Sequence, residues 1–428
     1  MRYTFKRLLI ADTVLMLITG LLYCGAIFNG FQTNWDDQWV VKNVYTISGV
    51  NTSNIHDIFF HFYHGQYAPI NQIYYTIIYS VFGYDSKAFH LFSILLHIAN
   101  TLLVLRIILA ITNLTVDPSK GNKFRIAFLT ALFFGISPIM VESVAWLSAS
   151  KVVLYAFFYL LSLLSYIKYM EQRQLRYYSI ALILFIFSFG AKEQAVILPL
   201  CLLFLDFIVK RSLTLEVIFY EKIPFFIISA YFAIITLLSQ EASGEGLLSA
   251  EAKYPFYQNI SFACYSLLQY AYKCLLPIDL NYLYPFPNLP GTLMPLWFWS
   301  YLGLFIIIVY AGYHYLQQRW ILFGISFFVI HLTTVLHVIP ISRHAIIADR
   351  YIYVSTIGIF FILSVILENL ISKNRFFLIP ATLYFFSLFV LGIKQIKVWQ
   401  DSSSLKYELR QMIMERENEN TNGSQNEK

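Results

Sequence analysis

The apolar stretch LLIADTVLMLITGLLYCGAIF, at residues 8–28, decides the fold class of this chain. Its length matches the about 20 residues that a helix needs to cross the hydrocarbon core of a bilayer. Arg2, Lys6 and Arg7 precede it, and no small-residue cleavage site separates it from the polar residues that follow. We therefore predict a retained first membrane helix that starts in the cytoplasm, and not a secretory signal peptide.

The composition extends this prediction to the whole chain. Hydrophobic residues make up 58% of the 428 residues and charged residues only 13%, whereas soluble domains contain about 25% charged residues. A soluble enzyme, a disordered chain and a coiled coil are therefore poor fits. The net charge of +6 comes from basic residues in short gaps between apolar runs. This distribution indicates cytoplasmic loops and no nucleic-acid partner.

Twelve apolar segments predict an all-α, polytopic integral membrane protein with about 11–13 transmembrane helices. The segments are 8–28, 88–111, 124–139, 152–169, 177–190, 196–209, 223–238, 260–276, 296–315, 320–338, 351–371 and 376–393. Segment 260–276 is the weakest because it contains several polar residues, and a short or re-entrant helix fits it. We favour eleven full spans, which place the C-terminus outside the cell and Arg319, Lys373 and Arg375 in the cytoplasm.

The predicted membrane domain covers residues 1–394 and includes a long first external loop at 29–87. A polar tail follows at 395–428. Its last part is rich in Asn and Glu, a composition that predicts disorder at the end of the chain.

The first external loop carries the adjacent carboxylates Asp36 and Asp37, flanked by Trp35 and Trp39. Two such acids at a membrane surface are costly without a use or a partner. A neighbouring like charge raises one pKa, which suits a general base. The pattern equally fits a helix cap between interfacial tryptophans.

Histidines follow the carboxylates, among them His64 in the first loop and His90 at the start of the second span. They form no HExxH-type pattern, and the four cysteines lack metal-ligand spacing. We expect polar contacts at the mouth of a cavity and no metal site.

Two further external segments carry isolated charges. Glu142 follows Pro138 in an otherwise uncharged stretch, so it either caps a short interfacial helix or faces a cavity. Lys192, Glu193 and Gln194 occupy a very short turn between two apolar runs. An interfacial ion pair accounts for them as well as a substrate site does.

A fourth segment contains Arg343, His344, Asp349 and Arg350. Arginine presents a planar fork that matches phosphate oxygens. If this loop is external, it joins the carboxylates on one face and suits a lipid phosphate attacked by a hydroxyl. The alternative is a cytoplasmic loop in which Asp349 pairs with Arg350.

The order of these motifs resembles the membrane part of the transmembrane-and-tetratricopeptide O-mannosyltransferases and their bacterial relatives, which are protein O-mannosyltransferase-like enzymes of the GT-C fold. The resemblance covers residues 8–405 and rests on the Asp-Asp pair, Tyr67–Ile70, Phe82-Gly83, Phe89-His90, Leu95–Asn100, Ser137-Pro138, Val141–Trp146, Ala191–Gln194, Ala348–Tyr351 and Val398–Asp401. The chain departs from the family in lacking the tetratricopeptide repeats. It also has Ser137 where a histidine is common and Ala195 where a glycine is common.

The resemblance implies a glycosyltransferase that moves a hexose such as mannose from a polyprenyl-phosphate donor to a hydroxyl acceptor, with inversion and without a metal or other cofactor. It places the catalytic acid in the first loop. Spacing does not separate the two aspartates; Asp37 is our first choice for the base and Asp36 our second, with Glu142 as a third carboxylate that orients the acceptor. The remaining candidates would bind substrate: Lys192, Glu193, Gln194, Arg343, His344, Asp349, Arg350, His64 and His90.

Several alternatives remain open from the sequence. The acceptor is a protein, or else a glycan or lipid. A transporter or flippase would line a pathway with Glu142, Lys192 and Arg350, and a non-catalytic scaffold is a third class. We expect a multi-pass protein among membrane lipids, in a bacterial inner membrane with a periplasmic site, or in the endoplasmic reticulum of a eukaryote.

Overall fold

The computed structural model describes residues 5–115, 121–244, 254–337 and 345–410. Across these residues the backbone is mainly helical, with a non-helical stretch at 276–295 and two isolated β-bridges, Tyr63–Gln66 and Tyr284–Ile347. The α-helices are α1 Phe5–Tyr23, α2 Asp37–Val40, α3 Val44–Ser48, α4 Thr52–Phe60, α5 Pro69–Phe82, α6 Ser86–Thr115, α7 Lys123–Ile136, α8 Val141–Ala145, α9 Ser150–Gln172, α10 Leu175–Ala191, α11 Leu198–Ile208, α12 Ile223–Ala242, α13 Phe256–Leu275, α14 Ser300–Gly312, α15 Arg319–Leu332, α16 Thr356–Lys373 and α17 Leu378–Val398. The prediction of an all-helical chain is confirmed.

The number of full-length spans is lower than the predicted 11–13. Of the described residues, seven helices are long and apolar enough to cross a membrane, or eight if a bent pair counts as one span. That pair, α7 with Pro138–Ala145, is bent by 54°. Pro138 explains the bend, because proline lacks an N–H and disfavours the helical conformation of the residue before it. A hydropathy profile stays high across such a break, although the regular helix stops there. It is also high along α10 and α15, which are apolar but shorter than a full span.

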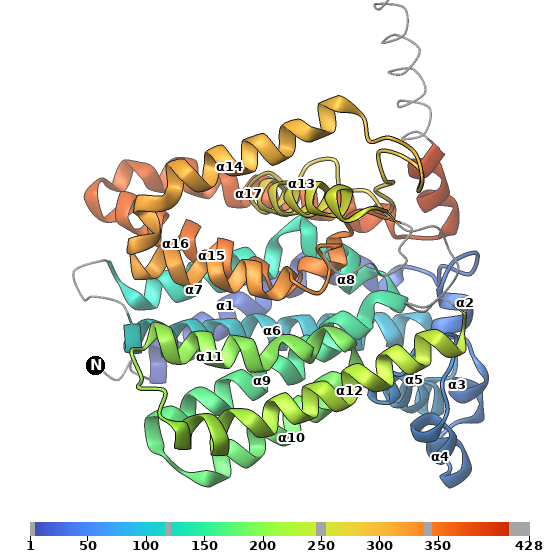
Figure 1. Ribbon diagram of the computed structural model, residues 1–428. Coiled ribbons are helices and arrows are strands. Elements are labelled where there is room, and N and C mark those ends of the chain that lie inside the picture. The colour runs from blue at the N-terminus through green and yellow to red at the C-terminus, as the bar shows by residue number, and fades with distance from the viewer. Residues whose placement is uncertain (1–4, 116–120, 245–253, 338–344, 411–428) are drawn as a thin grey trace, which may run out of the picture.

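The helices form a bundle with two distinct ends (Figure 1). The start of α1 lies at one end, and the short helices α2–α4 lie at the other. Arg125 pairs with Glu368 at 2.6 Å near the first of these ends, and Arg319 donates to the carbonyl of Ile208 at 3.2 Å. Arg350 lies at the opposite end, bonded to Glu142. Arg125 and Arg319 therefore lie at one end of the bundle and Arg350 at the other.

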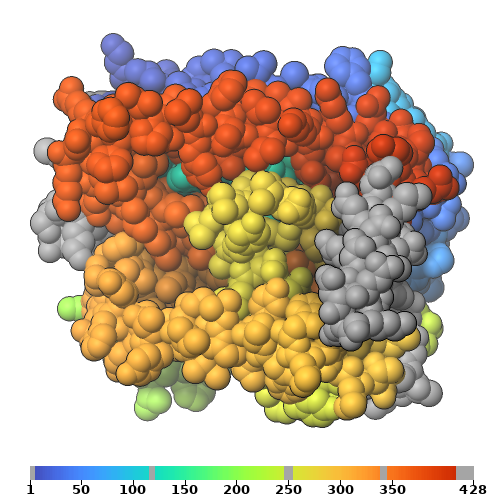
Figure 2. Space-filling view, turned by 90° about the horizontal axis from the view of Figure 1, so that it is seen from above, coloured from blue at the N-terminus to red at the C-terminus, as the bar shows by residue number. Residues whose placement is uncertain are grey.

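Helix α13 is the segment that the sequence identified as the weakest span. It is not among the helices long and apolar enough to cross a membrane. Seen from above the bundle, it lies between α14 and α17 (Figure 2). Its side chains reach the chain just before η8 (Asp349–Ile352), where the Tyr270 hydroxyl donates to the Ala348 carbonyl at 3.3 Å. The helix therefore supports the arginine-bearing segment.

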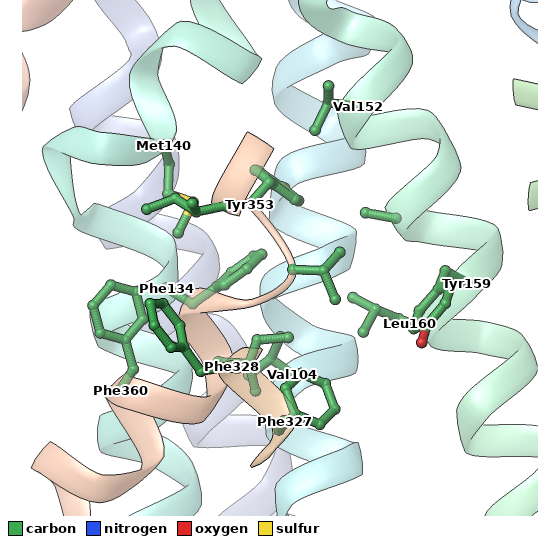
Figure 3. Close-up of a cluster of buried hydrophobic side chains, with 14 of the residues drawn as sticks. Val104, Phe134, Met140, Val152, Tyr159, Leu160, Phe327, Phe328, Tyr353 and Phe360 are labelled. Atoms are coloured by element: carbon green, nitrogen blue, oxygen red, sulfur yellow. The ribbon is translucent and has the colours of Figure 1, made fainter. Parts of the chain in front are cut away.

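The bundle core is aromatic and closely packed. Figure 3 shows Phe134, Phe328 and Phe360 among the buried side chains that fill the space between neighbouring helices. At the crossing of α15 and α16, a Cβ atom on Gly358 would overlap the carbonyl oxygen of Gly324. The two backbones therefore touch, a contact that small residues permit in membrane helices. Helix α14, in contrast, has no buried residue.

The loop at 29–87, which the sequence predicts to be external, is folded into helices. Asn43 and Asn51 cap α3 and α4 by accepting the backbone N–H groups of Thr46 and Asn54 at 2.9 Å. Helix α5 packs on α10 so closely that a Cβ atom on Gly190 would lie 2.6 Å from Ile70 Cγ1. The loop is thus a small helical layer fixed to one end of the bundle.

The polar tail predicted from residue 395 is partly docked. The Trp399 side chain is 1% exposed, and its carbonyl accepts hydrogen bonds from Asn29 Nδ2 at 3.1 Å and Gln32 Nε2 at 2.9 Å. The first part of the tail therefore belongs to the folded unit. The segment predicted to be disordered lies outside the described residues.

Candidate active site

The two adjacent aspartates have different environments. Asp37 is fully buried. Its Oδ1 accepts hydrogen bonds from the Ser148 backbone N–H at 2.8 Å and from the Ser148 hydroxyl, and its Oδ2 accepts from the Gln32 N–H at 2.7 Å. Burial raises the pKa of Asp37 to about 6, although these hydrogen bonds lower it. Asp37 thus joins the first loop to the segment before α9.

Asp36 is half-buried and weakly engaged. Its Oδ1 accepts one hydrogen bond, from the indole N–H of Trp39 at 3.3 Å. Among the described residues no cationic side chain forms an ion pair with it. The Asp36 carboxylate therefore accepts fewer hydrogen bonds from the described residues than the Asp37 carboxylate does.

Glu142 and Arg350, which are far apart in sequence, form a buried ion pair. Arg350 Nη1 lies 2.5 Å from Glu142 Oε1, and the Arg350 backbone N–H donates to Oε2 at 2.8 Å. The guanidinium also lies 5.2 Å from the ring centre of Trp146 and 5.0 Å from that of Tyr351. These contacts fix the orientation of the arginine fork at the end of the bundle.

Two lysines complete a group of cations. Lys192 Nζ bonds Glu193 Oε1 at 3.2 Å, and Lys151 Nζ bonds Gln66 Oε1 at 3.0 Å. The charge of Lys151 interacts with those of Lys192, Glu193, Asp36 and Arg350. The site therefore gathers three cations and a carboxylate without an ion pair among the described residues, where α9 starts and α10 ends.

An aromatic wall lies beside these charges. The ring of Tyr282 lies 4.5 Å from that of Trp35 and 5.5 Å from that of Trp146, and Trp146 stacks on Trp399 at 5.3 Å. The hydroxyl of Tyr282 interacts with the charges of Arg350, Asp36 and Glu142. The wall therefore borders both the carboxylate and the arginine.

The other predicted site residues lie around this centre or apart from it. Asp349 is buried and accepts from the Tyr284 hydroxyl at 3.0 Å; burial raises its pKa, and the charge of Glu142 raises it further. Gln194 Nε2 donates to the Tyr351 carbonyl at 3.4 Å. These two residues hold the segment that carries Arg350.

The predicted histidines that the structure describes differ in position: His64 lies near the site and His90 lies apart from it. His64 packs its ring 5.2 Å from that of Trp39, the residue whose indole N–H donates to Asp36. His90 is fully buried in α6 beneath the backbone of Asn29 and Gly30, so it does not face the site. Arg343 and His344 lie outside the described residues.

Sequence reasoning did not assign Lys151, Gln66 or Tyr282 to the site. Lys151 begins an apolar segment, and a lysine there fits an ordinary helix end. Tyr282 comes from the polar segment after α13, one of 32 tyrosines in the chain. The only usable signal was an isolated lysine on the face predicted to be external, where the charge rule expects few basic residues.

No group of three His, Cys, Asp or Glu side chains in the described part of the chain is placed to hold a metal ion. No protein-family model matches the chain, and no curated protein or solved structure matches it either.

Proposed function

We propose that this chain is a membrane glycosyltransferase that moves a sugar from a polyprenyl-phosphate donor to a hydroxyl acceptor, with inversion. One observation carries the proposal: Asp36, a carboxylate that forms no ion pair with the described residues, interacts with the charge of Lys151, and the charge of Lys151 also interacts with those of Lys192 and Arg350 at the same end of an apolar helix bundle. The resemblance of the motif order to GT-C fold enzymes supports the same reaction.

The cations suit a phosphate leaving group. Lys151, Lys192 and Arg350 offer N–H donors where negative charge grows as the sugar leaves, and such preorganised donors supply a large part of catalysis. Glu142 holds Arg350 through both the backbone and the side chain. We therefore assign Glu142 as a positioning residue for the arginine.

Asp36 is the general base in this proposal. It takes the proton of the acceptor hydroxyl while the hydroxyl oxygen forms a bond to the anomeric carbon. The bond between that carbon and the phosphate oxygen breaks on the opposite face, and its electron pair goes to the phosphate. Asp37, our first choice from the sequence, is less suited because three protein hydrogen bonds already occupy its carboxylate.

The membrane supplies the donor. A polyprenyl chain can remain in the bilayer against the apolar outer faces, such as that of α14, while its phosphate reaches the cations. Arg125, Arg173 and Arg211 belong to short basic gaps that the charge rule assigns to the cytoplasm. The active centre, at the other end of the bundle, is then on the non-cytoplasmic side.

The test is transfer of radiolabelled hexose from polyprenyl-phosphate mannose, glucose or galactose to acceptors in membranes that carry the protein. Replacing Asp36 by Asn should lower transfer about 10²–10⁴-fold, the usual contribution of a general base. Asp85→Asn, at an exposed aspartate of the same loop, is the matched control and should be silent.

The same assay separates the two aspartates. Asp37→Asn should lower the amount of folded protein, because it removes a buried carboxylate that joins two segments. If Asp37→Asn protein is folded and inactive while Asp36→Asn protein transfers sugar at the wild-type rate, Asp37 is the base. Transfer that is unaffected by both changes and by the double change would overturn the proposed reaction at this site.

Arg350→Lys tests the phosphate contact. Lysine keeps the charge but cannot present the planar fork, so transfer should fall while the protein stays folded. Arg319→Lys, at the other end of the bundle, is the control. Unchanged donor turnover in an Arg350→Ala protein would remove the arginine from the proposed mechanism.

A further inference from the structure

Helix α4, in the helical layer formed by residues 29–87, has an exposed apolar stripe. Ile55, Phe59 and Phe62 are 37%, 37% and 41% exposed. Their spacing places them on one side of the helix, with Phe62 just past its end. Asn54 is buried in the layer instead, where its side chain bonds a neighbouring carbonyl at 2.7 Å. Exposed apolar side chains that cluster in this way mark a surface that contacts a membrane or another protein.

Polar residues occupy the rest of the exposed surface of α4. Ser53 and His56 are exposed, and Asp57 is partly exposed. Phe60 stacks its ring 4.7 Å from that of His56, so it belongs to this polar side and not to the stripe. A helix with one apolar side that carries aromatic residues, and one polar side, suits the boundary between lipid and water.

The stripe lies close to the level at which a membrane helix ends. One of the helices long and apolar enough to cross a membrane covers Val217–Ala242 and includes α12, which runs up to the layer in Figure 1. The Ser239 hydroxyl donates to the Gly65 carbonyl at 3.1 Å, and a Cβ atom on Gly65 would lie 2.5 Å from Ser243 Oγ. The turn that follows Phe62 is therefore at the last turn of this helix, a depth at which aromatic residues are enriched.

Helix α12 presents an apolar surface to the bilayer along its length. Its buried residues are only Phe225, Ser229 and Ser239. On its outer side, side chains at helical spacing are 55–63% exposed: Ile227, Tyr231, Ile234 and Leu238. In a helix that crosses a membrane, such a surface contacts lipid.

This lipid-facing surface reaches α4 through Tyr67. The Tyr67 hydroxyl interacts electrostatically with that of Tyr231 and donates to the Phe59 carbonyl at 3.1 Å. The ring centre of Tyr67 lies 6.0 Å from that of Phe62. The stripe of α4 and the outer side of α12 are therefore parts of one continuous surface.

The charge of the layer indicates which kind of contact the stripe makes. From residue 43 to residue 86 the sequence contains no lysine or arginine, and its acidic residues are Asp57 and Asp85. Anchoring through anionic headgroups needs clustered basic side chains. The contact is therefore apolar and independent of headgroup charge.

We propose that Ile55, Phe59 and Phe62 insert into the lipid leaflet at the site end, and that the bilayer is the partner of this surface. The layer that carries Asp36 is then held at the boundary between lipid and water, where the phosphate of a lipid lies. The contact forms whether or not the chain transfers sugar, because none of the three side chains belongs to the proposed catalytic groups.

The depth of nitroxide labels tests the proposal in the full-length protein in phosphatidylcholine liposomes. Phe59→Cys and Phe62→Cys are labelled one at a time, and Ser53→Cys, on the polar side of α4, is the matched control. The exposed Cys24 is first replaced by Ser, and this background protein reports any label on the buried cysteines. Oxygen concentrates in the bilayer, whereas a neutral nickel chelate stays in water. The ratio of oxygen to nickel accessibility should be several-fold higher at residues 59 and 62 than at residue 53.

Each other result of this measurement overturns the proposal. Labels at residues 59 and 62 that nickel reaches as readily as at residue 53 face water. Labels that neither reagent reaches are covered by protein, either a second copy of the chain or another partner.

Lipid composition and unlabelled protein supply two further checks. The ratio should be the same in bilayers that contain phosphatidylglycerol and at high salt; a contact that needs phosphatidylglycerol and is lost in salt would contradict an apolar anchor. In the wild-type protein, phosphatidylcholine with a diazirine near its headgroup should react with the peptide that contains Phe59 and Phe62. Absence of this adduct, with adducts formed on α12, would also overturn the proposal.

Discussion

The two ends of the helix bundle each hold a cluster of charged side chains, but the side chains are paired differently in the two clusters. At the end remote from the site, Asp206, Arg211, Glu221 and Lys222 form a closed network. Lys222 Nζ lies 2.5 Å from Asp206 Oδ2, and Arg211 Nη2 lies 2.5 Å from Glu221 Oε1. The Tyr166 hydroxyl bonds both Glu221 and Lys222. Every charge in this network has an opposite charge beside it.

The site end is not closed in this way. Glu142 pairs with Arg350 and Glu193 with Lys192, but Asp36 and Lys151 each bond a neutral side chain. The first network is complete without a ligand and serves the fold. In the second, the Asp36 carboxylate and the Lys151 ammonium group form no ion pair with the described residues, and we propose that they contact a ligand. Pairing, more than the number of charges, separates a structural cluster from a binding site.

The largest effect should come from breaking the closed network. Lys222→Met leaves Asp206 buried beside a single, more distant cation, Arg211 at 3.5 Å. Removing one partner of a buried pair costs about 3–5 kcal/mol, so the free energy of unfolding in detergent should fall by that amount. Adding Asp206→Asn should restore part of it. A Lys222→Met protein as stable as wild type would contradict the structural role of this cluster.

The corresponding change at the site end should affect activity instead. Lys151→Met removes a cation that hydrogen-bonds a neutral side chain and forms no ion pair with the described residues, so the melting temperature should change little. Sugar transfer should fall about 10²–10³-fold, the usual cost of losing one preorganised donor to a leaving group. Lys87→Met, at an exposed lysine of the first loop, is the control. If Lys151→Met instead strongly destabilises the protein and activity per folded molecule is retained, the cluster at the site end is structural too, and the prediction is wrong.

A pH dependence should distinguish Asp37 from its neighbour. Burial raises the pKa of Asp37 from 3.8 to about 6, so the folded protein holds this proton more strongly than the unfolded chain does. The contribution to stability is therefore complete below about pH 4 and is lost as the pH rises through 6, by at most about 3 kcal/mol. Unfolding measured across this range should show the slope in wild type and a smaller slope in Asp37→Asn. Equal slopes in wild type and Asp37→Asn would show that Asp37 is not the cause of this pH dependence of stability.

The smallest effect is expected between the two clusters, where packing is uncharged. Gly358→Ala inserts a methyl group into the contact between α15 and α16 and should cost about 1–3 kcal/mol by overpacking. Gly303→Ala, where a Cβ meets nothing within 4 Å, is the matched control and should be neutral. A pH profile of transfer that shifts in Gly358→Ala would show that packing, as well as charge pairing, sets the behaviour of the site.

The twelve apolar segments could be predicted because hydropathy and length are local properties of the sequence. Each of them contains a helix in the structure. The number of full-length spans could not be predicted, since a break such as Pro138 interrupts a helix without interrupting its hydropathy. The helices of the first loop were also missed, because short helices such as α3 and α4 depend on caps and on packing against the bundle.

For the candidate site, too, some features could be predicted from the sequence and others could not. The sequence alone identified isolated charges next to apolar segments, among them Asp36, Glu142, Lys192 and Arg350, and left a structural and a functional explanation open for each. Only the tertiary structure decided how they differ. The carboxylate of Asp37 is occupied by Ser148, a residue 111 positions away, and Arg350 is held by Glu142, 208 positions away. Burial and hydrogen bonding depend on distant segments, and adjacent identical residues such as Asp36 and Asp37 give the sequence no means to tell them apart.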